Sequence, residues 1–162
     1  MSPSRKLLLL AGLSLAALGM LYGLHYAIFV EHQTLDRMGG SLAQAFSLAA
    51  AGNGLQAQHS IDAYASTKFD YVRQLDLHSH WIGLAMVLIV LGAAFDGVRF
   101  SERGKIWIAA SLTAGSFVFP LGVILQTLSY GGSYASALAI LGSAVVTAGL
   151  AAVAWGFGRS GQ

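Results

Sequence analysis

The sequence contains no cysteine, which excludes disulfide bonds, thiolate metal ligands, iron–sulfur clusters and covalent haem attachment through a Cys-x-x-Cys-His motif. Charged side chains are scarce as well: they make up 10% of the 162 residues, against roughly 25% in soluble globular domains. The nine lysines and arginines are scattered, whereas a protein that binds nucleic acid needs a clustered basic face. Any metal or haem must therefore be held by histidine, carboxylate, tyrosine or methionine side chains.

Long apolar runs take the place of the missing charges. Hydrophobic residues make up 56% of the chain, and its mean hydropathy is +0.65. Runs without a formal charge predict four membrane-spanning helices, over about 7–30, 78–95, 106–128 and 135–157. The sequence therefore predicts an all-α protein, a polytopic four-helix bundle in the lipid bilayer. We expect one domain over 1–162, because the chain is too short for a second folding unit.

The segment 31–77 is the long polar part of the chain, and we expect it to form an outer loop with short helices over 41–51 and 56–69. Six lysines and arginines flank the predicted helices on the side of the N-terminus, and three lie in the loop. By the positive-inside rule, both termini are then cytoplasmic. The loop faces the periplasm or the cell exterior, as in a protein of the bacterial inner membrane.

All five histidines fall on that outer side of the predicted bundle: His25, His32, His59, His78 and His80. Ionisable groups at or inside a membrane are costly to desolvate, so they are candidates for function. His78 and His80 open the second predicted helix and are expected to act as ligands or in catalysis. His25 lies deeper, where it either makes a structural hydrogen bond to a neighbouring helix or ligates a cofactor. His59 is expected to have no role.

Three hypotheses follow from these residues. Haem b would be ligated by one or two histidines in an apolar pocket between helices; the candidates are His25, His78 and His80. Alternatively, copper, zinc or non-haem iron would bind at the outer membrane face, where imidazole and carboxylate groups suit such metals; the candidate ligands are Glu31, His32, Asp76, His78 and His80. A third alternative needs no cofactor: an accessory structural subunit of a larger membrane complex, packed through the small residues of the last helix.

The start of the second predicted helix reads H-x-H-x-x-x-L-x-M, with His78, His80, Leu84 and Met86. This pattern resembles small relatives of the main subunit of the haem–copper oxidases. The length, the four helices and the His-Ser pair at 78–79 are also similar to the styrene oxide isomerases, oligomeric membrane enzymes that contain haem b and rearrange epoxides to aldehydes.

The resemblance implies that His78 is the axial ligand of haem b. It implies an oxidoreductase or a haem-dependent isomerase that acts on a small hydrophobic molecule. Two features depart from the isomerase pattern: Leu84 stands where that family has an asparagine, and the stretch 114–123 lacks the aspartate and tyrosine of its third helix. A homo-oligomer is expected, because four helices enclose little space.

Overall fold

The computed structural model describes residues 1–129 and 132–159, and all regular structure in these residues is helical, which confirms the all-α prediction. The elements are α1 (Pro3–Phe29), α2 (Glu31–Ala50), α3 (Gly54–Ala94), a short 3-10 helix η1 (Phe95–Gly97), α4 (Glu102–Ser129) and α5 (Ser133–Gly158). Four of them, α1, α3, α4 and α5, are long and apolar enough to cross a membrane, which is compatible with an integral membrane protein.

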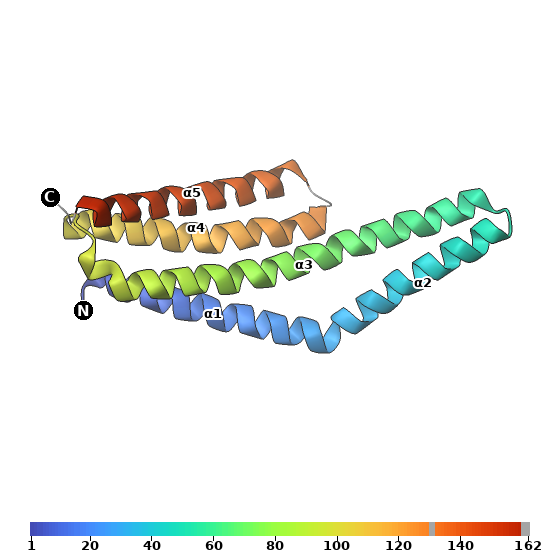
Figure 1. Ribbon diagram of the computed structural model, residues 1–162, viewed down its shortest axis with the longest axis horizontal. Helices are drawn as coiled ribbons and strands as arrows, with labels where there is room; N and C mark the ends of the chain where they lie inside the picture. Colours follow the sequence, from blue (N-terminus) through green and yellow to red (C-terminus); the bar gives the residue numbers. More distant parts are fainter. Residues whose placement is uncertain (130–131, 160–162) are drawn as a thin grey trace.

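The expected outer loop over 31–77 is instead almost entirely helical, so the described residues contain five α-helices, one more than the four predicted to span the membrane. The predicted short helices over 41–51 and 56–69 are parts of α2 and α3. Helix α3 has 41 residues, about 60 Å at 1.5 Å per residue, and continues from this segment into the bundle. Its first part packs against α2 as an antiparallel pair, the α2–α3 hairpin (residues 31–77), which projects beyond the bundle (Figure 1).

Two breaks in the helical path shape this hairpin. At its tip, Gly52 has a φ of 77°, and the N–H of Asn53 donates to the carbonyl of Leu48 over 2.9 Å, which are features of a Schellman helix end. At its base, Val30 separates α1 from α2 with φ −123° and ψ −43°. The Thr34 hydroxyl donates to the Val30 carbonyl over 2.9 Å, a type of side-chain bond that often bends helices. Helix α1 diverges from α3 along its length, and at Val30 the chain turns back toward α3, which it approaches along α2 (Figure 1).

Glycines let the membrane-spanning helices approach closely, chiefly as the pairs α1–α3 and α4–α5. A Cβ atom on Gly142 of α5 would lie 2.5 Å from the backbone nitrogen of Phe119 in α4. A Cβ atom on Gly122 of α4 would in turn meet the backbone of Ala139 in α5. Small residues are enriched where helices pack in membranes, because they allow the backbones to touch. Small residues of the last helix thus pack against α4 within the same chain.

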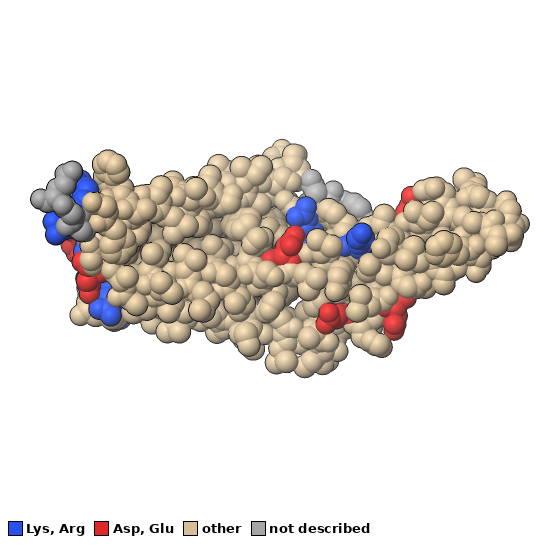
Figure 2. All heavy atoms as spheres, in the orientation of Figure 1, with Lys and Arg blue, Asp and Glu red and all other residues tan. Residues whose placement is uncertain are grey.

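Charged side chains are confined to two zones along the long axis of the molecule (Figure 2). We call one the terminal end, because α1 begins and α5 ends there; the other is the hairpin base, near the bend at Val30 (Figure 1). Between them, α3 has no charged residue from 77 to 95, a length of about 28 Å that matches the hydrocarbon core of a bilayer. The structure therefore defines an uncharged band of one membrane thickness.

Hydrogen bonds at the terminal end connect the start of α1 to the turn between α3 and α4. The buried Ser4 hydroxyl donates to a carboxylate oxygen of Glu102 over 2.9 Å. Asp96 lies in the exposed turn beyond the uncharged band and accepts from the Ser2 hydroxyl at 3.2 Å and from Arg5 at 2.9 Å. These two hydrogen bonds lower the pKa of Asp96.

Candidate functional site

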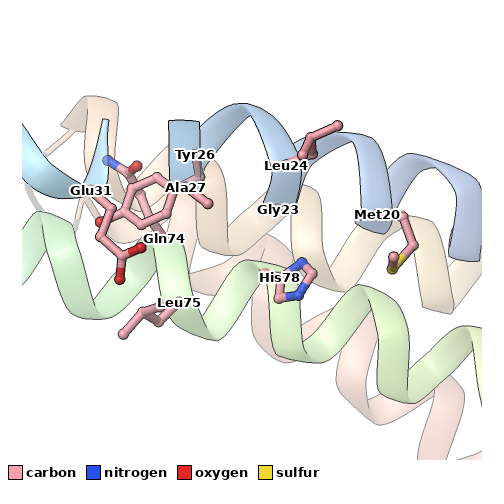
Figure 3. A pocket seen from close by; sticks show the side chains of 9 residues that line it. All are labelled: Met20, Gly23, Leu24, Tyr26, Ala27, Glu31, Gln74, Leu75 and His78. Atoms are coloured by element: carbon pink, nitrogen blue, oxygen red, sulfur yellow. The ribbon is translucent and has the colours of Figure 1, made fainter. Parts of the chain in front are cut away.

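A pocket opens between α1 and α3 just below the bend at Val30, where the two helices begin to separate. Its volume is about 400 Å³, which lies within the range of small-molecule sites. Figure 3 shows its walls, which come from three helices. Four of the nine lining residues have polar side chains (Tyr26, Glu31, Gln74 and His78), and the other five are apolar or glycine: Met20, Gly23, Leu24, Ala27 and Leu75.

His78 is the pocket residue whose chemistry is best defined. Its Nδ1 lies 3.0 Å from the carbonyl oxygen of Gly19, in the facing helix α1. A carbonyl oxygen only accepts hydrogen bonds, so Nδ1 carries the proton in this arrangement. The neutral imidazole then has an unprotonated Nε2, which is able to ligate a metal or accept a hydrogen bond.

Gly23 makes room for this imidazole. A Cβ atom at Gly23 would lie 2.5 Å from Cε1 and 2.7 Å from Nδ1 of His78, closer than any side chain tolerates. Gly19 and Gly23 are four residues apart, so they lie on the same side of α1 and present a shallow groove to α3. Figure 3 shows the ring of His78 between α3 and the part of α1 that contains Gly23. Two glycines on one helix thus position a histidine on the other.

The end of the pocket nearest the bend is polar. Gln74 lies one helical turn from His78 along α3, and Glu31 begins α2 on the opposite wall (Figure 3). Tyr26 is 6% exposed, and its hydroxyl lies near the side chain of Thr34 without forming a well-aligned hydrogen bond. Its ring packs against Tyr22 and Tyr71, with centroid separations of 6.5 and 6.4 Å. A buried hydroxyl left without a well-aligned hydrogen bond is costly, so this end of the pocket is suited to a ligand with polar groups.

Two of the predicted haem ligands do not line this pocket. His25 is exposed on α1 and contacts the ring of Phe29, with centroids 5.4 Å apart. His80 faces a different helix, because its ring packs on Phe119 of α4 at a centroid separation of 4.6 Å. Positions 78 and 80 differ by about 200° around a helix, so one side chain faces α1 and the other α4.

The predicted metal ligands are dispersed as well. His32 lies 3.5 Å from Asp36 on the exposed surface of α2. Asp76 pairs with Arg73 at 3.6 Å. Of the five candidates, the pocket brings together Glu31 and His78. Among residues 1–129 and 132–159, no group of three or more histidines and carboxylates is arranged to hold a metal ion.

Of the nine pocket residues, Glu31 and His78 were predicted from the sequence; three of the others bear directly on the site, Gly23, Tyr26 and Gln74. Gln74 was within reach of sequence reasoning, because it lies four residues before His78 and therefore on the same helical face. The other two were not, because their role depends on which face of α1 meets α3. No protein-family model, curated protein or solved structure matches this chain.

Proposed function

We propose that this chain is a membrane-embedded protein that binds haem b in the pocket between α1 and α3, with Nε2 of His78 as the iron ligand. One observation carries the proposal: His78 lines the pocket, and its Nδ1 lies 3.0 Å from the carbonyl oxygen of Gly19, which leaves Nε2 as the ring nitrogen that can ligate iron. Histidines that ligate metals almost always donate their other ring N–H to a carbonyl, a carboxylate or water. That bond fixes the tautomer and raises the basicity of the ligating nitrogen.

The other pocket residues fit a porphyrin as well. Apolar walls suit its ring, and they are formed by Met20, Leu24, Ala27 and Leu75. The carboxylates of haem lie at one edge of the ring and need hydrogen-bond donors, which Tyr26 and Gln74 offer at the polar end. The segment that begins at His78 resembles haem-binding membrane proteins. This resemblance also indicates His78 as the iron ligand.

His78 is the one histidine in the lining of this pocket, since His25 and His80 lie elsewhere. Bound there, haem b would supply an iron atom with an open coordination position for small-molecule chemistry. Iron with a single protein ligand is suited to such chemistry, whereas iron ligated by two histidines is suited to electron transfer. We therefore propose an oxidoreductase or isomerase that acts on a small hydrophobic molecule.

The same proposal includes an orientation. Arg5, Lys6, Arg99, Arg103, Lys105 and Arg159 lie at the terminal end, against Arg37, Lys68 and Arg73 on the other side. The positive-inside rule then places the terminal end in the cytoplasm. In a bacterial inner membrane, the pocket lies near the periplasmic face and the α2–α3 hairpin projects into the periplasm.

The test is an optical spectrum of the detergent-purified protein after supplementation with haem b. We expect a Soret band in the wild type and its loss in His78→Ala, because no other histidine lines the pocket. His59→Ala is the matched control, since His59 is exposed on the hairpin, and it should keep the band. A wild-type protein without a Soret band, or a His78→Ala variant that keeps it unchanged, would contradict the proposal.

Replacing Glu31 with glutamine should tighten haem binding by about 3- to 10-fold, or about 0.7 to 1.4 kcal/mol. The Glu31 carboxylate is part of the polar end of the pocket, where it would repel the carboxylates of haem. An absorbance titration at fixed ionic strength measures the change. Gln74→Glu is the converse variant, because it adds a negative charge to the same end and should weaken binding. Weaker binding by Glu31→Gln would show that the polar end prefers a ligand with hydrogen-bond donors.

A further inference from the structure

The outer part of the α2–α3 hairpin carries no charge at all. From Met38 to Ile61, the chain contains no aspartate, glutamate, lysine or arginine. We call this part the hairpin tip (residues 38–61). It lies beyond the charged hairpin base and shows neither blue nor red in Figure 2. Helices that face water usually have charged and polar residues on their outer side, so an uncharged tip this far from the bundle needs another explanation.

The inner seam of the tip is made of small residues. Ala45 of α2 and Ala57 and Ser60 of α3 are each at most 8% exposed, so the two helices lie close together. Large apolar side chains point outward instead: Phe46 is 75% exposed and Leu55 is 77% exposed. The tip is thus a paired helical unit with its largest apolar side chains on the outside.

The composition of the tip favours a protein surface over lipid as its partner. Gln44, Asn53, Gln56 and Gln58 are distributed along it, and such amides are costly to place in hydrocarbon. The uncharged stretches on either side of the turn at Gly52, 38–51 and 53–61, are also too short to cross a bilayer. Few charges together with an outward aromatic side chain are typical of the core of a protein–protein interface.

We infer that the hairpin tip is a contact surface for a second copy of this chain in the same membrane. Membrane insertion gives every copy the same orientation, so neighbouring hairpins project to the same side and their tips reach the same height. Identical residues then meet one another, and a surface without charges avoids the repulsion that like charges would cause. Gly39 and Gly40 have open space around them, so another helix can approach the backbone there.

The absence of cysteine makes this inference directly testable. We would introduce Phe46→Cys or Leu55→Cys into the full chain and treat native membranes with an oxidant or a short bis-maleimide. Gln33→Cys is the matched control, because it is also exposed on α2 but lies at the charged hairpin base. We expect a disulfide-linked or maleimide-linked dimer of twice the chain mass for the tip variants and several-fold less of it for the control.

A second measurement does not depend on cross-linking geometry. Phe46→Glu places like charges at the contact and should lower the fraction of dimer or higher oligomer in mild detergent, while the exposed site leaves the fold unchanged. The inference is overturned if neither tip variant exceeds the control, or if the cross-linked product contains a different protein. None of these measurements requires haem, so this result is independent of the Soret band of the wild type.

Discussion

Gly122→Val should lower the free energy of unfolding by about 3 kcal/mol, the upper end of the usual cost of overpacking a well-packed interior. A Cβ atom at Gly122 would collide with the backbone nitrogen and Cα of Ala139 in α5. Backbone atoms in the middle of a helix cannot move aside as a side chain can, so α4 and α5 must separate along their contact. Because α5 packs chiefly on α4, the whole helix would lose much of its attachment to the bundle.

Thermal or detergent-induced unfolding of the purified protein measures this loss. Gly83→Val is the matched control, because Gly83 lies in membrane-spanning α3 and a Cβ atom added there would meet nothing within 4 Å. Both variants carry the same change in helix propensity, so the difference between them reports the collision alone. Equal losses of stability in the two variants would show that α4 and α5 do not pack as closely as this structure has them.

Gly23→Ala should weaken haem binding by about 10- to 100-fold, as is typical when a group that orients a metal ligand is lost. The added methyl group would occupy the position of the His78 ring and force it away from the Gly19 carbonyl. The imidazole is the end of a side chain, so it can swing out and leave the helices in place. We therefore expect a loss of stability of only about 1 kcal/mol, the usual net value of one hydrogen bond.

The combination of the two effects distinguishes this role of Gly23 from a general packing defect. Haem titration and thermal unfolding should be measured on the same preparation, with Gly83→Ala as the control. Gly83 lies in α3 with open space around it and outside the pocket lining, so this variant should keep both haem affinity and stability. If the Gly23→Ala variant bound haem as tightly as the wild type, the hydrogen bond from His78 to Gly19 would not be needed for haem binding.

The local composition of the sequence determined the fold class and the number of helices that are long and apolar enough to span a membrane. Uncharged runs of sufficient length correctly indicated α1, α4, α5 and the second part of α3, because a segment in hydrocarbon must be apolar and must satisfy its own backbone hydrogen bonds. The turn at Gly52 falls between the short helices predicted over 41–51 and 56–69, where glycine adopts a positive φ that few other residues adopt readily. The histidine that lines the pocket, His78, was among the predicted site residues because an ionisable group at the mouth of an apolar run stands out by composition alone.

Only the tertiary structure decided what the segment 31–77 does and which histidines belong to the pocket. The segment is mixed in polarity, and its helices form an antiparallel pair through small residues that carry no sequence signal of their own. His78 meets Gly19 across 59 residues of chain, while His80 faces α4 instead. These assignments depend on how each helix is rotated about its axis. Glycine contacts between helices set that rotation. The sequence of a single helix does not show which residues of another helix its glycines will meet.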